Sequence, residues 1–576
     1  MDKNFLIAVI LMSVIVLLFM SPQYQQRFGR DLPPKPAVEQ TVRKSTEKFP
    51  SLISKEKPGI TGLSTKPAED AVEPSAIRPE ETDKAIQINA TAKAQEFTLG
   101  NDDIEIQFST RGGIITKATM KNFRGRDKTE LAQLVTEGEA WYSGRIVDGD
   151  FELNISDIIF SRERVSIRSV ELHAEITGDR RITRTFALDE QGFMLHAGSS
   201  LSGDWDNPEL HFNWHGPVNT TEAKNKKLRI WPLSLLMRDD STAYDKIAYL
   251  GQGDRTTFNN GKEEKLQRVY SNESSQKIDA RKSKMGGQDF FIGDLNWYAV
   301  RNKYFMTAAI PKEKMRWKAA AAYSMVQGIK WYDFSISKNL SDGVTDLDIY
   351  IGPIAYDTLK SYNENLTELM ELSWRFIRPL SIVFLWLFKK FHAVIPNWGL
   401  VIVAFSIFIK IVLFPLSHKS FVSMRKMSAL QPQIAELREK YKNNTQKLHQ
   451  ATMELYKKEG VNPFGGCLPM LFQMPVFFAM YPVVGRSFEL RQAMFIPNWI
   501  EDLSRPDPYY ILPIAMGISM FVQQKLTMTD PNQKAMLYIM PVMMIFLFAN
   551  FSSGLTLYWF LFNVLSYMQQ TIHKRK

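Results

Sequence analysis

The chain has 576 residues, 45% of them hydrophobic, and a formal net charge of +10. That length is enough for several domains of ~100–200 residues each. The one cysteine, Cys467, excludes an internal disulfide and a metal site built from several cysteines. Lysine and arginine are scattered or flank apolar segments, so nucleic-acid binding is not expected apart from contact with a ribosome.

The N-terminal 93 residues contain two contrasting segments. Residues 1–20 include an apolar run from Phe5 to Met20, and no small-x-small cleavage pattern follows it. We expect an uncleaved N-terminal transmembrane anchor there. Residues 21–93 are rich in Pro, Lys, Glu, Thr and Ser, a composition that buries too little apolar surface to offset the entropy of ordering. This segment is predicted to be a disordered periplasmic linker.

Residues 94–353 show short runs in which apolar and polar residues alternate, as in 104–108, 181–186 and 331–336. Turn signals such as Arg111-Gly112-Gly113 separate these runs. Alternation with a period of two is typical of strands with one face in water. The pattern predicts a large β-sandwich domain.

Residues 357–396 have a helical pattern with one apolar face, formed by Trp374, Ile377, Leu380, Phe384, Leu387 and Phe391. Basic residues surround that face, which favours an amphipathic helix lying in the membrane interface. Pro379 is expected to kink this helix.

Residues 398–576 are predicted to form a helical core with five transmembrane spans, at about 398–416, 464–484, 509–526, 536–551 and 555–571. The segment 417–462 and the tail Lys574-Arg575-Lys576 are strongly basic, whereas 485–508 is not. The positive-inside rule then assigns both termini to the cytoplasm. The expected fold is a multi-domain membrane protein with an anchor helix, a periplasmic β-sandwich and this α-helical core.

Within 417–462, apolar residues follow three-four spacing on both sides of Asn443-Asn444, which predicts an antiparallel helical hairpin in the cytoplasm. Among its cations, Arg425, Lys426 and Lys442 are the candidate contact residues. Two interpretations stay open: a solvated connection, or a docking surface for a ribosome or targeting factor.

The sequence contains no recognisable enzyme signature: no phosphate loop, no H-E-x-x-H and no G-x-S-x-G. The histidines of the β region, His173, His196, His211 and His215, have no metal-ligand or catalytic spacing. We therefore expect no enzymatic activity, no cofactor and no metal.

Lys410 stands out because it lies inside the first predicted core span. A lysine at the centre of a span costs ~2.5–3.5 kcal/mol, so such residues usually face a wet cavity or a partner. The alternative is that Lys410 snorkels to the cytoplasmic surface. That is awkward here, because helical side chains tilt toward the helix N-terminus, which in this span faces away from the cytoplasm.

Other predicted spans carry polar residues that either bond between helices or line a hydrophilic groove with Lys410. Gln473, Tyr558 and Asn563 are among them. Methionines such as Met474 add adaptable apolar surface that suits varied clients.

Several motifs resemble the YidC/Oxa/Alb family of membrane protein insertases, in its Gram-negative type with a large periplasmic domain. They are 461–469 with Gln473-Met474-Pro475, then 507–513, and 553–559. The resemblance implies a groove in which Lys410 carries the positive charge, with Ser406 and Trp559 along the client path. This chain departs from the family by having Ser552 where proline is common, and its basic tail is short.

The resemblance also implies a function and a location. The chain would integrate nascent membrane proteins into the bacterial inner membrane, alone or with the Sec translocon, and would meet the lipid bilayer, ribosomes and targeting factors. Two rival hypotheses are a secondary transporter and a membrane-anchored periplasmic carbohydrate-active protein. A transporter usually shows internal repeats, which are not evident here.

Overall fold

The structure is a computed structural model that describes residues 93–575 except 126–128, 136–139, 177–178, 218–245, 260–261, 270–275, 279–287, 315, 327–328, 341–342, 363, 443, 462–467 and 528–533. The predicted anchor at 1–20 and all but the last residue of the predicted linker at 21–93 lie outside this range. So do Cys467 and most of the 461–469 motif.

The β region folds into antiparallel strands, three of which cover the alternating runs of the sequence: β2 (Ile104–Ser109), β9 (Arg181–Leu188) and β18 (Ile329–Asn339). The other described strands are β1 (Glu96–Gly100), β3 (Ile114–Arg124), β4 (Leu131–Val135), β5 (Ala140–Asp148), β6 (Phe151–Asn154), β7 (Ser161–Glu163), β8 (Ser169–Glu175), β10 (Met194–Ser202), β11 (Glu209–Pro217), β12 (Lys246–Asn259), β13 (Lys262–Val269), β14 (Gln276–Ile278), β15 (Gln288–Arg301), β16 (Phe305–Pro311), β17 (Trp317–Val326) and β19 (Val344–Pro353). A short 3-10 helix, η1 (Ile155–Asp157), follows β6.

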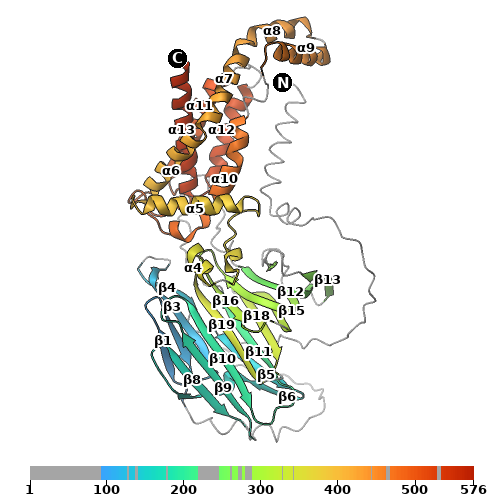
Figure 1. Cartoon of the computed structure of the whole chain (residues 1–576), viewed down its shortest axis with the longest axis vertical. Coiled ribbons are helices and arrows are strands. Elements are labelled where there is room, and N and C mark those ends of the chain that lie inside the picture. The colour runs from blue at the N-terminus through green and yellow to red at the C-terminus, as the bar shows by residue number, and fades with distance from the viewer. Residues whose placement is uncertain are drawn as a thin grey trace, which may run out of the picture. The chain divides into compact units, whose positions relative to one another are not determined.

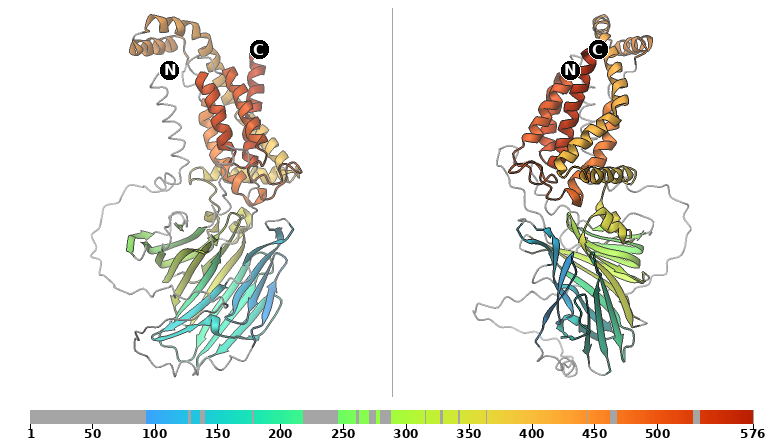
Figure 2. Two further views of the ribbon diagram at one scale, coloured as in Figure 1. Left: turned by 180° about the vertical axis from the view of Figure 1, so that it is seen from behind. Right: turned by 60° about the vertical axis from the view of Figure 1, so that its left-hand side comes forward.

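Two runs of paired strands meet at the long strand β15. One run passes from β8 through β9, β10, β19 and β16 to β15, and the other passes from β5 through β11, β18 and β17 to the same strand. β15 can join both because residues 298–301 pair with β16 while residues 288–293 pair with β17. The result is the predicted β-sandwich, shown from two sides in Figure 2.

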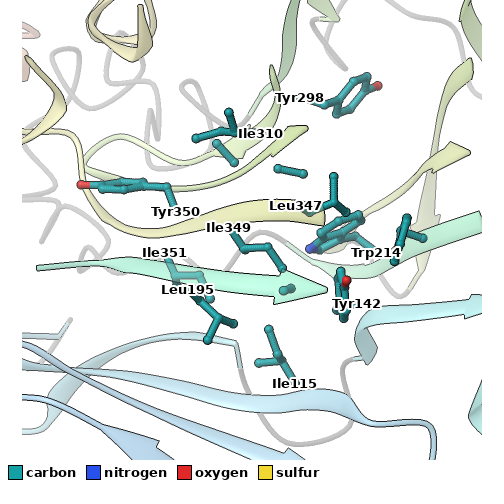
Figure 3. Packing of buried hydrophobic residues seen from close by; sticks show 14 of the residues in the cluster. Ile115, Tyr142, Leu195, Trp214, Tyr298, Ile310, Leu347, Ile349, Tyr350 and Ile351 are labelled. Atoms are coloured by element: carbon teal, nitrogen blue, oxygen red, sulfur yellow. The ribbon is translucent and has the colours of Figure 1, made fainter. Parts of the chain in front are cut away.

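The interior of the sandwich is filled by apolar side chains from both runs. In Figure 3, Leu195 of β10 and Ile349 of β19 lie close to Ile115 of β3 and Trp214 of β11, and all four are buried. Burial alternates along β9, so that every second side chain faces this core. The predicted turn between β2 and β3 is present, with φ of +75° and +56° at Gly112 and Gly113, a conformation that favours glycine.

The segment after β19 corrects one prediction. Instead of a single kinked helix over 357–396, the chain forms α4 (Tyr356–Ser361), the 3-10 helix η3 (Leu366–Met370) and α5 (Arg378–His392). Asn365 and Glu371, on either side of η3, have left-handed φ of +56° and +51°, which interrupts an α-helix. Pro379 occupies the first turn of α5, where a missing N–H is tolerated, so it begins the helix and does not kink it.

Helices cover the five segments that were predicted as spans: α6 (Trp398–Val412), α10 (Leu468–Arg486), α11 (Ile511–Thr527), α12 (Lys534–Phe548) and α13 (Ser553–Arg575). A short 3-10 helix, η5 (Phe488–Leu490), follows α10. Within the described residues, no helix is by itself both long and apolar enough to cross a membrane. One pair does meet that requirement together, namely α6 and α7 (Phe414–Ala429), which are bent by 58°.

Beyond α7 lie α8 (Gln431–Lys440) and α9 (Thr445–Lys458), over the segment predicted as a helical hairpin. Leu430, Ile434 and Val461 form a small buried cluster against Met427 and Leu455. Within the helical part, α8 and α9 lie at the end away from α5 (Figures 1 and 2).

Candidate functional site

Lys410 lies in the last turn of α6. The helix begins at Asn397, whose side-chain oxygen accepts a hydrogen bond from Leu400 N at 3.1 Å and so satisfies a free backbone donor. Lys410 is only 8% exposed although it carries an ammonium group. The sequence placed this residue within an apolar helix, and the structure buries it between helices.

Two residues of α13 hold the Lys410 ammonium. Its Nζ donates a hydrogen bond to Ser566 Oγ at 2.8 Å and lies 4.7 Å from the centre of the Phe562 ring. The Ser566 hydroxyl donates in turn to the Phe562 backbone carbonyl at 2.7 Å. Both contacts are with neutral groups, and no described carboxylate lies within ion-pair distance of Lys410. The positive charge is therefore solvated by the protein but not neutralised by it.

The structure joins the other predicted polar residues in pairs and not into one cluster around Lys410. Gln473 Nε2 donates to Tyr558 Oη at 2.9 Å, and both side chains are buried. Asn563 Nδ2 donates to Ser519 Oγ at 3.4 Å, which links α13 to α11. Ser406 is fully buried one turn before Lys410, but its hydroxyl donates to the Ile402 carbonyl of its own helix at 2.7 Å.

The predicted apolar contacts and the predicted hairpin cations are placed differently. Met474 and Trp559 are half-buried, and the Trp559 ring packs against Phe477 and Phe548 at centroid distances of 5.2 and 5.5 Å. The three hairpin cations are exposed: Arg425, Lys426 and Lys442.

Sequence reasoning missed Ser566 and Phe562, the residues that contact Lys410 directly. The signal was present, because Ser566 lies three residues after the predicted Asn563 and residues three apart share a helix face. Extending that spacing along the same helix reaches Gln569 and Gln570, which are also buried.

The motif at 507–513 has a structural role at the start of α11. The Asp507 carboxylate accepts hydrogen bonds from the backbone N–H of Tyr509 at 3.0 Å and of Leu512 at 2.7 Å, and from Trp499 Nε1 at 2.8 Å. These bonds cap the helix and tie it to the preceding loop. The same loop receives the start of α13, since Ser553 N donates to the Arg505 carbonyl at 2.6 Å.

Comparison with known proteins identifies both halves of the chain. The family described as "YidC periplasmic domain" matches residues 96–387, and the family described as "60Kd inner membrane protein" matches residues 390–576. The first match covers half of the chain and the second covers the helical part that holds Lys410.

Full-length relatives agree. The membrane protein insertase YidC of Francisella philomiragia is 32% identical over 100% of this chain and 98% of its own length. The YidC of Coxiella burnetii, strain Dugway 5J108-111, is 30% identical over 99% and 95%, respectively. A crystal structure of an active YidC insertase aligns with 84% of this chain and 92% of its own at 17% identity and a TM-score of 0.35. The chain belongs to the YidC family of membrane protein insertases, which act on nascent membrane proteins at the inner membrane.

Proposed function

We propose that the chain inserts its clients through a polar site centred on Lys410, where the ammonium meets the polar or acidic flank of the client. One observation carries this proposal: a buried ammonium whose contacts are a neutral hydroxyl and an aromatic ring. Burying a charge without a counter-charge is costly. A client carboxylate would supply the missing charge, and the site would in turn lower the cost of moving that carboxylate through the apolar phase.

The energetics require no nucleotide. About 20 apolar residues at roughly −0.3 to −0.6 kcal/mol each make integration of the client span favourable, so the polar flank is the barrier. In this scheme Gln473, Tyr558 and Asn563 continue the polar surface, while Met474 and Trp559 contact the apolar part of the client. Ser406 packs the turn before Lys410. The proposed topology places the N-terminal anchor and five core spans in the inner membrane, both termini in the cytoplasm and the β domain in the periplasm.

The test compares insertion by variants of Lys410 at matched protein levels, using one client with an acidic flank and one with a neutral flank. Lys410→Arg should function, Lys410→Leu should impair the acidic client more than the neutral one, and Lys410→Glu should be worst because like charges repel. The exposed Lys525→Glu serves as the control for a changed net charge. If Lys410→Leu equals the wild type on both clients, Lys410 only snorkels and the proposal is wrong.

We also propose that the exposed cations of the α7–α9 region, Arg425, Lys426 and Lys442, contribute to a docking surface for ribosomes or targeting factors. Cooperation with the Sec translocon stays a prediction of the same kind. Simultaneous reversal of the three charges should reduce crosslinking of the chain to ribosomes carrying a client, while the helices remain folded. Unchanged crosslinking would favour a solvated connection.

A further inference from the structure

Gln569 and Gln570, near the end of α13, combine deep burial with unmet hydrogen-bonding capacity. Each side chain is 7% exposed. In the described part of the chain, neither the amide nitrogen nor the amide oxygen of either residue has a hydrogen-bond partner. Four unmet polar atoms are thus concentrated in two consecutive residues.

Such an arrangement is unfavourable unless something binds there. A buried donor or acceptor without a partner costs ~1–3 kcal/mol, and native proteins hold few of them. An apolar residue at either position would avoid this cost. The two amides therefore indicate a ligand that arrives from outside the folded chain.

The chemistry of the amides restricts that ligand. A side-chain amide offers two N–H donors and one acceptor oxygen. Its donors and its acceptor can all be satisfied only by a partner that both donates and accepts hydrogen bonds. A carboxylate only accepts and an ammonium only donates. A peptide backbone has one N–H and one C=O per residue, and an extended segment presents both kinds of group in succession.

Their position relates the amides to the Lys410 site. Gln569 and Gln570 follow Ser566 by three and four residues, a spacing that places all three along one side of the helix. At 1.5 Å per residue they lie ~6 Å beyond Ser566, toward the C-terminal end of α13. That end is cytoplasmic in the proposed topology, so a client entering from the cytoplasm passes the two amides before it reaches Lys410.

We propose that Gln569 and Gln570 bind the backbone of an extended, polar client segment, independently of the charge of that segment. This inference rests on the proposed function and adds a second recognition element to it. Lys410 interacts with the charge of the client flank, whereas the glutamines bind its exposed peptide groups. A flank with free N–H groups should therefore insert better than one without them.

The experiment uses the full chain in native membranes and a single-span client with two neutral flanks of equal length, one of Gly and Ser and one rich in Pro. Proline has no backbone N–H, so its flank offers acceptors only. The wild type should insert the Gly/Ser flank about fivefold better, the factor for one net hydrogen bond. In Gln569→Leu with Gln570→Leu, that preference should disappear.

The matched control carries the same change at two exposed glutamines of α9, Gln446→Leu with Gln450→Leu, and should keep the wild-type preference. The double variant in α13 should still discriminate between wild-type Lys410 and Lys410→Leu on an acidic flank. The acidic-flank client therefore tests the Lys410 proposal, and the two neutral-flank clients test the glutamine proposal. The failure of one proposal can be distinguished from the failure of the other. An unchanged Gly/Ser preference in the α13 variant would mean that only water occupies the amides, and would overturn the inference.

A second measurement applies if the leucine variant does not accumulate. A photo-crosslinking residue at position 570 should capture the client flank during insertion, whereas the same residue at Met568, which is 52% exposed, should not. Capture at 568 and not at 570 would overturn the inference as well.

Discussion

His196 is held between two carboxylates of the β domain. Its Nδ1 lies 2.7 Å from Asp348 Oδ1, on the neighbouring strand β19, and its Nε2 lies 2.9 Å from Asp189 Oδ1. The hydrogen bond with Asp348 is the main cause that raises the pKa of His196 above its usual value. Lys312 Nζ also approaches Asp348, at 3.6 Å. The protonated imidazolium therefore joins two strands and a loop.

This geometry predicts a pH dependence whose sign follows from linkage. Because the folded pKa exceeds the unfolded value of ~6.5, the stabilisation is fully present below about pH 6.5 and is lost as pH rises through the folded pKa. The side chain is 40% exposed, so solvent screens the effect and we expect less than ~1 kcal/mol. Hydrogen exchange of β10, corrected for the intrinsic rate, should show the wild type losing protection as the pH rises from about 6.5 through the folded pKa of His196.

His196→Gln should show a smaller loss over the same range, because the side-chain amide does not titrate. His173→Gln provides the control, since His173 pairs only with Glu163 among the ion pairs of the described chain, at 3.1 Å. An identical pH response in wild type and His196→Gln would contradict the prediction.

Arg184 shows what alternation along a strand cannot reveal. The pattern of β9 places residue 184 toward the core together with Ile182 and Phe186, and the structure confirms that its side chain is fully buried. Its guanidinium donates to the carbonyls of Gly112, Gly113 and Tyr142. Those acceptors lie 42 to 72 residues away in the sequence, so only the folded sandwich brings them to the arginine.

The helices and strands that were predicted correctly are those whose local sequence pattern is enough to determine their secondary structure. Long apolar segments became α6 and α10–α13, and alternating runs became β2, β9 and β18. The region 357–396 was predicted wrongly because its form depends on distant packing. Leu366, Leu369 and Met370 of η3 are buried in the cluster of the β domain, and that packing accompanies the left-handed residues that end the helical path.

The same limit applied to the candidate site. Lys410 could be identified because a charge within an apolar segment is visible in sequence. Ser566 shares a helix face with the predicted Asn563, but its contact with Lys410 joins residues 156 positions apart, which only the folded chain brings together.

The start of α13 yields a prediction about element packing. A Cβ atom at Gly554 would lie 2.6 Å from Val484 Cγ1 and 2.9 Å from Ile402 Cδ1, which is closer than real contacts allow. Gly554→Ala should therefore force α13 away from α6 and α10 and destabilise the helical part by ~1–3 kcal/mol. Thermal unfolding in detergent, followed by loss of the monodisperse species, measures this effect.

Gly485 in α10 is the matched control. A Cβ there would meet only Ser552 Oγ, at 3.9 Å, an ordinary contact distance. Gly485→Ala should be neutral or slightly stabilising, since alanine favours a helix by up to ~1 kcal/mol over glycine. If both variants unfold at the same temperature, close packing at Gly554 does not limit stability.

At the scale of the whole molecule, the buried apolar residues fall into separate clusters. One runs from Phe97 to Leu372 and another from Ile377 to Tyr558. Lys410 and its partner Ser566 belong to helices of the second cluster. The boundary between the clusters lies after η3, some twenty residues beyond the last strand, because α4 and η3 pack with the β domain.

This boundary determines how the β domain can be removed. Deleting residues 94–356 and resuming at 357 would leave Leu359, Leu366 and Leu369 without the core that buries them. Deleting 94–372 and resuming at Ser373 removes them with their partners. We expect both deletions to retain insertion, because the Lys410 site lies wholly in the helical part, but the longer deletion should reach the higher level in the membrane.

The decisive measurement is insertion of a single-span client per molecule of each deletion variant, with quantified membrane levels. In the shorter deletion, substituting serine for the three leucines that have lost their packing partners should raise its membrane level toward that of the longer deletion. The reason is that exposed apolar surface promotes aggregation and degradation. Combining the longer deletion with Lys410→Glu should abolish the activity that remains, which separates insertion by the helical part from any background. If the longer deletion is abundant in the membrane yet inactive, the β domain takes part in insertion itself, and a site confined to the helices is insufficient.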